Sequence, residues 1–263
     1  MAEDQAPEVP GRLTLIGTGH VFRIEETVRD AIVALAPDVV FIELDRGRLQ
    51  ALLYKRRHGS LPPSKGSFVH RRLQRFQEAI AKRYGSDVGG EMLGAVAGGQ
   101  AVGARIVLID QGADQTVRKA LQALTWSEKL RGVGMLVGGG LRSLLPGKRP
   151  DIDDEVRKYQ EDPQAALDEL ARRFPSIKRV VIDERDELMA AHIIRALPPG
   201  AHGVAVVGDG HVPGMTPRLD AFEITTYRLP EVRAGALPKP ELATGDGRDV
   251  SFGHETEWPP QSS

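Results

Sequence analysis

The chain has 263 residues, of which 41% are hydrophobic and 27% charged, and its formal net charge is −1. This length allows one large domain with a substantial core, and the near-neutral net charge gives no electrostatic reason to expect a nucleic-acid partner. The absence of cysteine excludes disulfides, thiolate metal ligands and cysteine nucleophiles. The first residues are acidic, and no window has the roughly 18 consecutive apolar residues of a membrane helix. We therefore expect a cytoplasmic protein with no integral membrane segment.

Short apolar runs alternate with helical patterns along the chain. The spacing of apolar residues predicts strands at about 12–16, 38–45, 105–110, 203–207 and 221–227, the last at an edge of the sheet. Helices are predicted at about 24–36, 46–56, 68–84, 89–104, 114–124, 126–136, 152–160, 164–173 and 176–196, with a glycine-rich loop near 138–140. This alternation favours an α/β fold with a mainly parallel or mixed central sheet flanked by helices.

The predicted elements indicate one α/β domain over residues 11–228. Residues 1–10 are interpreted as a flexible leader, and 126–196 as a helical subdomain or insertion that covers the carboxyl edge of the strands. Residues 229–263 are rich in proline, glycine and charge, so we expect a polar C-terminal tail that is mobile or loosely docked.

A Gly-x-Gly-His motif occurs twice, near opposite ends of the chain. Gly17-Thr18-Gly19-His20 and Gly208-Asp209-Gly210-His211 each follow a short apolar strand. Glycines after a strand permit a tight turn and a close approach of the backbone to a ligand. Because both histidines come where strands end, we expect His20 and His211 to converge on one catalytic or metal-binding cleft.

Carboxylates follow the other predicted strands. Glu43 and Asp45 end the second strand, Asp110 ends the third, and Asp209 follows the fourth. Open α/β sheets bind ligands beyond the carboxyl ends of their strands, so these groups could share a site with the histidines. Imidazoles and carboxylates suit a divalent ion such as Mn²⁺, Co²⁺ or Zn²⁺, and equally suit metal-free acid–base chemistry. For Asp45 and Asp209 we favour a structural role, whereas Glu43 ends an unusually apolar run.

Glu91 is the only charged residue between Val88 and Ala104, in a predicted helix built otherwise from small and apolar residues and one glutamine. A carboxylate buried there would cost several kcal/mol unless it were paired or metal-bound. Two interpretations stay open. Glu91 is a metal ligand or general base, or it forms a buried ion pair with Arg118 or Arg185.

Two further patterns point to other kinds of partner. The first motif and its following acidic residues imitate a dinucleotide fingerprint, but Phe22 and Pro213 stand where a third glycine would be needed. The stretch 45–87 carries eleven Lys/Arg against three Asp/Glu, which could meet an anionic membrane, nucleic acid or an acidic peptide. Because aromatic residues are sparse in it, we favour a solvated amphipathic helix.

Taken together in chain order, these motifs resemble the TraB/PrgY family, which is named for pheromone-shutdown proteins and is related to the Tiki metalloproteases. The resemblance covers roughly residues 12–228. It is carried by Gly17-Thr18-Gly19-His20, Glu43-Leu44-Asp45, Gly90-Glu91-Met92, Val102-Gly103-Ala104, Asp110, Thr116-x-Arg118, Glu184-Arg185-Asp186-x-x-Met189 and Gly208-Asp209-Gly210-His211-Val212-x-Gly214.

The resemblance implies an α/β fold in which both histidine motifs and the glutamates face a common cleft. In the Tiki branch this cleft would be a metal-dependent peptidase centre, and in the TraB/PrgY branch it would inhibit or sequester a peptide pheromone. The chain departs from the family in two respects. It has a polar tail where family members often have membrane helices, and it has Gln111 after Asp110 where an arginine is expected.

The leading hypothesis is a metal-dependent hydrolase that cleaves a peptide or amide bond. His20, Glu43 and His211 would hold a divalent ion, with Glu91 as a further ligand or general base. Arg118 or Arg185 would stabilise the developing oxyanion or anchor a substrate carboxylate. The alternative is a non-catalytic regulator that binds a peptide in the same cleft. The expected partners are a peptide or small-molecule substrate, and a homodimer is also considered.

Overall fold

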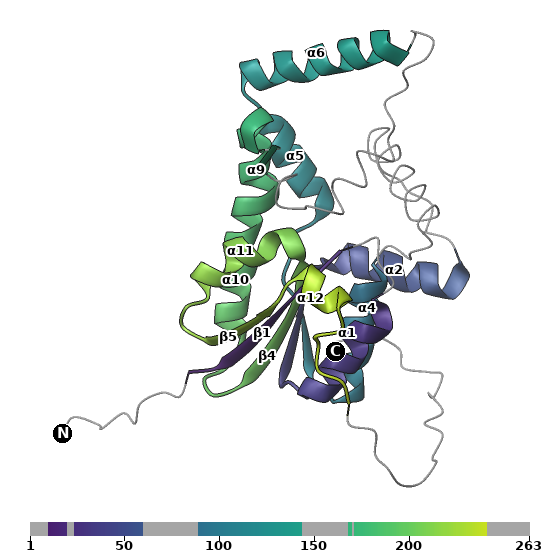
Figure 1. Ribbon diagram of the computed structural model, residues 1–263, viewed down its shortest axis with the longest axis vertical. Coiled ribbons are helices and arrows are strands. Elements are labelled where there is room, and N and C mark those ends of the chain that lie inside the picture. Colours follow the sequence, from purple (N-terminus) through teal and green to yellow (C-terminus); the bar gives the residue numbers. More distant parts are fainter. Residues whose placement is uncertain (1–9, 20–23, 60–88, 144–167, 170, 241–263) are drawn as a thin grey trace, which may run out of the picture.

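The computed structural model describes residues 10–19, 24–59, 89–143, 168–169 and 171–240 (Figure 1). The predicted helices at 68–84 and 152–160, and half of that at 164–173, lie outside these residues. Five parallel strands form one sheet in the order β3-β2-β4-β1-β5. The strands are β1 (Arg12–Thr18), β2 (Val39–Ile42), β3 (Arg105–Leu108), β4 (His202–Gly208) and β5 (Glu223–Tyr227). The predicted α/β fold is confirmed, with a sheet that is wholly parallel over the described strands.

Helices cover both faces of the sheet. The longer helices are α1 (Glu25–Leu35), α2 (Arg46–His58), α4 (Gly90–Ala101), α5 (Ala113–Ala123), α6 (Trp126–Ser143) and α10 (Glu184–Ala196). The shorter ones are α9 (Pro175–Lys178), α11 (Val212–Met215) and α12 (Leu229–Arg233), with single turns at Arg179–Asp183, Asp209–His211 and Thr216–Arg218.

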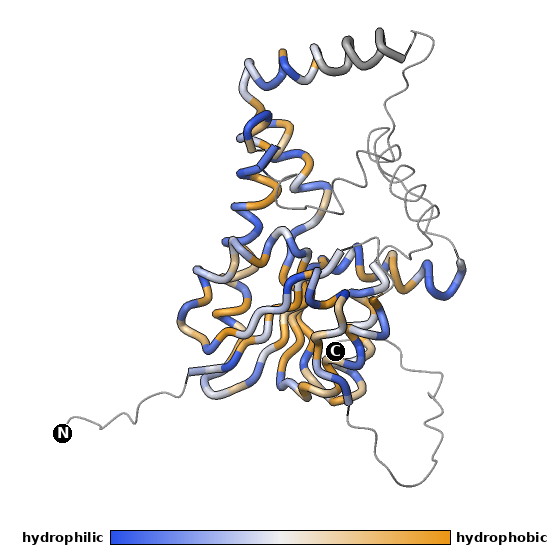
Figure 2. The backbone as a smooth tube through the Cα atoms, in the orientation of Figure 1, coloured by the Kyte–Doolittle hydropathy of each residue, from blue (hydrophilic) through white to orange (hydrophobic). Residues whose placement is uncertain are grey.

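The core consists of two apolar clusters, one on each face of the sheet. One contains Val40, Ile42 and Val206 packed against α1 and α4, and the other contains Phe41 and Val207 packed against α10 and α11. Successive strand residues are therefore buried on opposite faces, which explains why the strands are continuously apolar. Figure 2 shows these apolar strands between the surrounding helices.

The carboxyl ends of all five strands lie at one edge because the strands are parallel. The strand order also places β4, from late in the chain, between β1 and β2. Thr18 pairs with Gly208 in the register of β1 and β4, so the two glycine motifs begin side by side.

Two sequence predictions were wrong in detail. The predicted glycine-rich loop at 138–140 is helical, because α6 continues to Ser143; glycine disfavours a helix by only about 1 kcal/mol. The segment predicted as a loose tail begins with α12, and its Leu229, Val232 and Leu237 are buried in the core. These apolar residues are too few to give a periodic signal, so composition alone misplaced the end of the domain.

The predicted helical insertion divides into parts with different positions. Helix α10 packs on the sheet, whereas α6 projects away from it (Figure 1). Within the described residues, no helix is long and apolar enough to cross a membrane.

The contact between α1 and α4 depends on glycine. A Cβ on Gly94 would lie 2.3 Å from the carbonyl oxygen of Glu25, and backbone cannot move aside easily. We predict that Gly94→Ala lowers the free energy of unfolding by about 2 kcal/mol or more. Gly134→Ala is the control, because Gly134 lies in exposed α6 with open space around it, and there alanine should stabilise by up to about 1 kcal/mol. Urea unfolding measures both, and equal effects would contradict the close α1–α4 packing.

Candidate functional site

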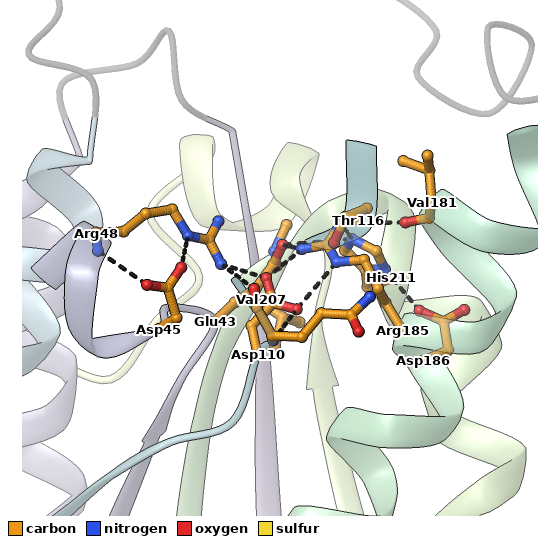
Figure 3. Close-up of polar contacts among 12 residues, drawn as sticks. Glu43, Asp45, Arg48, Asp110, Thr116, Val181, Arg185, Asp186, Val207 and His211 are labelled. Carbon is orange, nitrogen blue, oxygen red and sulfur yellow. Dashed lines mark hydrogen bonds and ion pairs between the residues drawn. The ribbon is translucent and has the colours of Figure 1, made fainter. Parts of the chain in front are cut away.

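Charged side chains from separate parts of the chain meet at the carboxyl edge of the sheet (Figure 3). Glu43 follows β2, Asp110 follows β3, and His211 follows β4. Arg185 and Asp186 come from the first turn of α10. We call these five residues the edge cluster; their contacts are buried or partly buried, as expected only for charges that compensate one another.

The guanidinium of Arg185 is the centre of the edge cluster. Its Nη2 donates to Glu43 Oε1 at 2.5 Å and to Asp110 Oδ2 at 2.6 Å, and its Nε donates to Asp110 Oδ1 at 3.0 Å. Its Nη1 donates to the carbonyl oxygen of Val181 at 3.1 Å. Burial would lower the pKa of Arg185, but the hydrogen bonds and charges of Asp110 and Glu43 raise it above its ordinary value. Arg185 is therefore held as a permanent cation between two strand ends.

A π-helical turn precedes this arginine. Residues Arg179–Asp183 form the turn, and Val181, which accepts from Arg185, lies within it. The sequence indicated one uninterrupted helix here. Short π segments inside helices are frequent at functional sites, because they change the direction in which the following side chains point.

Glu43 is held in its charged form. Its Oε2 accepts from the backbone N–H of Gly208 at 2.6 Å, and its Oε1 faces both Arg185 and Nε2 of His211, the latter at 3.4 Å. Burial raises the pKa of Glu43, but His211, Arg185 and the Gly208 N–H outweigh it and lower the pKa far below its usual range. The pKa of Asp110 is lowered as well, because Arg185 outweighs the effect of burial.

His211 is oriented by Asp186. Its Nδ1 lies 2.6 Å from Asp186 Oδ1, and its Nε2 lies 3.1 Å from Nη1 of Arg185. Nδ1–H therefore donates to Asp186 in either protonation state, and Nε2 is the atom that titrates. When Nε2 is neutral it accepts from Arg185, and when protonated it can donate only towards Glu43.

Carboxylates on both sides favour the protonated imidazole. Burial lowers the pKa of His211, but the charge of Glu43 and the hydrogen bonds of Asp186 and Glu43 outweigh it and raise the pKa to about 9. Burial raises the pKa of Asp186 itself, only partly offset by His211. At neutral pH, His211 is therefore a poised proton donor.

The glycines of the motifs make room for these side chains. A Cβ on Gly214 would lie 1.9 Å from Asp186 Oδ2, and one on Gly17 would lie 2.4 Å from Asp209 Oδ1. Gly208 lies close to the carboxylate of Glu43 and donates its backbone N–H to it. These glycines therefore leave room for the neighbouring carboxylates. This role explains the glycines of the motifs without a bound phosphate.

The two aspartates that we interpreted as structural have structural contacts. Asp45 caps α2 by accepting from the backbone N–H of Arg48 at 3.1 Å. Asp209 accepts from Arg228 in two hydrogen bonds of 2.8 Å and from the N–H of Leu229 at 2.7 Å, which fastens α12 to the sheet.

The remaining predicted site residues differ in their surroundings. Glu91 is 1% exposed in the first turn of α4, whereas Arg118 is exposed on α5 and has no ion pair with the edge cluster. His20 lies outside the described residues, so its expected meeting with His211 stays a prediction. Of the candidates, Glu43, Arg185 and His211 are brought together.

A divalent ion does not fit the described donors as they lie. The atoms of Glu43 and His211 that would bind it face the guanidinium of Arg185. Among the described residues, no three His, Asp or Glu side chains are grouped so as to hold a metal.

Sequence reasoning missed two members of this region. Asp186 was quoted only as part of the Glu184-Arg185-Asp186 motif and was given no role, although Gly214, three residues after His211, marks the space that its carboxylate needs. Arg48 was hidden in a basic stretch, yet it forms ion pairs with both Asp45 and Asp110.

We predict that His211 titrates with a midpoint near pH 9. The proton is retained by Glu43 and Asp186, and it leaves only when the pH rises through that value. NMR of histidine labelled at ¹³Cε1 measures the midpoint, and His211→Asn assigns the resonance. Gly214→Ala should lower the midpoint, because its Cβ displaces Asp186. A midpoint at or below 6.5 in the wild type would contradict the described electrostatics.

The model of the TraB/PrgY/gumN family matches residues 6–228. An uncharacterized protein of Methanocaldococcus jannaschii is 29% identical over 219 residues, which are 80% of this chain and 53% of that protein. The chain thus spans about half the length of this relative. Since the family model covers most of the chain and the whole edge cluster, the chain belongs to the TraB/PrgY/gumN family.

Proposed function

We propose that the chain is a hydrolase of peptide or related amide bonds whose chemistry takes place at the edge cluster. The observation that carries the proposal is the oriented pair of Asp186 and His211, 2.6 Å apart, with Nε2 directed at Glu43 and Arg185. This pair lies at the carboxyl edge of a parallel sheet, where open α/β folds bind ligands. A buried titratable group with a strongly shifted pKa at such an edge is a mark of a functional site.

His211 acts as the general acid. Its raised pKa keeps Nε2 protonated at neutral pH, so the proton is available for the leaving nitrogen. Asp186 is a positioning residue, because it fixes the tautomer and orientation of the imidazole through Nδ1.

Glu43 and Arg185 complete the reaction. In one concerted step, water adds to the carbonyl carbon, Nε2 of His211 gives its proton to the leaving nitrogen, and the C–N bond breaks, while Arg185 stabilises the negative charge on the carbonyl oxygen. The pKa of Glu43 is low partly because His211 is charged. As the imidazole loses its proton in this step, that pKa rises, so Glu43 accepts the proton that the attacking water releases. Glu43 then returns this proton to Nε2 of His211, which restores both groups.

Metal dependence is a separate proposal. Mn²⁺, Co²⁺ or Zn²⁺ could be held by Glu43 and His211 only if Arg185 withdrew from both. No step of the reaction above passes through such an ion.

A non-catalytic peptide-binding regulator is the second candidate. The observation that favours it is the closure of the edge cluster, in which Arg185 is already paired with Glu43 and Asp110. A cluster whose hydrogen bonds are already formed makes the site rigid, and a rigid site favours peptide binding as much as it favours catalysis.

We predict that His211→Asn lowers kcat/KM for peptide hydrolysis at least 100-fold, the lower end of what general acids contribute. Cleavage of a mixed-sequence peptide library, followed by mass spectrometry, identifies a substrate and measures the rate. His58→Asn is the matched control, because His58 is exposed on α2 and should leave the rate unchanged. Circular dichroism confirms that both variants fold.

Each outcome decides between the candidates. Equal rates for wild type and His211→Asn would remove His211 from the chemistry. Binding of library peptides without turnover by the wild type would support the regulator. Turnover that is lost after dialysis against a chelator and restored by Mn²⁺, Co²⁺ or Zn²⁺ would overturn the metal-free sequence of steps.

A further inference from the structure

Within the described part of the chain, the edge of the sheet nearest to Asp110 has backbone groups without a neighbouring strand. β3 is the last strand of the described sheet, and its residues are half-buried or exposed, whereas the residues of β2 are all buried. The N–H of Arg105 donates to Asp38 and that of Ile109 donates to Ile42, both at 3.0 Å. Backbone groups alternate in direction along a strand, so those of Ile106 and Leu108 point away from β2.

A groove of about 480 Å³ runs along this open edge between β3 and α2. Leu49 and Leu53 of α2 line it on one side, and Ile106 and Leu108 of β3 line it on the other. The groove is of the size that binding sites commonly have, and its walls are mainly apolar. It therefore combines apolar contacts with backbone N–H and C=O groups that bond to no other strand among the described residues.

The groove ends at the edge cluster. Asp110 lines the groove, and its carboxylate also binds Arg185. The charges at this end are already compensated, because Arg48 pairs with both Asp45 and Asp110. The apolar walls suit an apolar molecule. Arg46 and Arg105 also line the groove, without a carboxylate partner among the described residues, and they disfavour an occupant with positive charge.

The opposite edge of the sheet differs in character. There β5 exposes Glu223, Thr225 and Thr226, polar residues of the kind that discourage strand addition. The β5 edge can therefore serve as a control for strand addition at the β3 edge.

We propose that β3 binds the peptide substrate as an added strand. The occupant is an extended, uncharged segment with apolar side chains, whose backbone bonds to Ile106 and Leu108 while alternate side chains enter the groove. A peptide is favoured over a small apolar molecule, because only an extended backbone satisfies alternating donors and acceptors. The segment that continues past Leu108 then reaches Asp110 and Arg185. This inference rests on the proposed peptide function and names how its substrate binds.

The test uses a pool of fluorescein-labelled, acetylated hexapeptides built from Val, Ile, Ala and Thr. Fluorescence anisotropy with the full chain should show saturable binding. Ile106→Pro should weaken binding at least tenfold, since it removes an outward N–H without removing a bond to β2. Thr226→Pro is the matched control, because it places proline at an outward position of the other edge strand and should bind as the wild type does.

A second probe keeps the test decisive if Ile106→Pro fails to fold. The same pool with every central amide N-methylated retains its apolar side chains but cannot donate backbone hydrogen bonds. Wild-type affinity for it should fall at least tenfold. Equal binding of both pools, equal binding by folded Ile106→Pro, or no binding of the unmethylated pool would each overturn the added strand.

Failure of this inference is distinguishable from failure of the proposed hydrolase. Cleavage that depends on His211 but not on Ile106 would remove the added strand and leave the chemistry. Binding that depends on Ile106 without any cleavage would support the added strand and remove the hydrolase.

Discussion

Everything at the site depends on one buried cation, the guanidinium of Arg185. It is bonded to Glu43 and Asp110, which end two neighbouring strands, and it sits beside Nε2 of His211. Removing one partner of such a buried pair typically costs about 3–5 kcal/mol, although a well-packed apolar replacement of the whole group is often neutral. The contribution of this cluster to the free energy of unfolding therefore explains its presence poorly. A chemical role at the edge where α/β sheets bind ligands explains it better.

The topology of the sheet makes the cluster possible. Inserting β4 between β1 and β2 brings the Gly208 N–H to Glu43 and places His211 next to α10. Because every described strand is parallel, each contributes its terminal residue to one edge. The motif glycines then provide the space, as Gly214 does for Asp186.

Much of this arrangement was predictable from the sequence. The parts that were not predicted depend on side-chain contacts, which periodicity does not report. Continuous apolar runs indicated buried parallel strands, and their exits identified Glu43 and His211. Helix periodicity, however, says nothing about which charged residue turns inward, so Asp186 went unrecognised beside Arg185. The metal was inferred from ligand types and from the family resemblance, and it stays a prediction. Neither source indicated that the guanidinium of Arg185 lies against the same atoms of Glu43 and His211. Arg118, which the family resemblance indicated, lies exposed on α5.

The most direct test of the central claim replaces the cluster as a unit. In the triple variant Glu43→Gln, Asp110→Asn, Arg185→Met, the buried charges are removed together, so no carboxylate or guanidinium among these three is left alone. The measurement is the rate of peptide cleavage by this variant, once circular dichroism has shown it to be folded. The account predicts a folded protein with no detectable turnover of a peptide that the wild type cleaves. A folded triple variant that cleaves at the wild-type rate would show that the chemistry lies elsewhere.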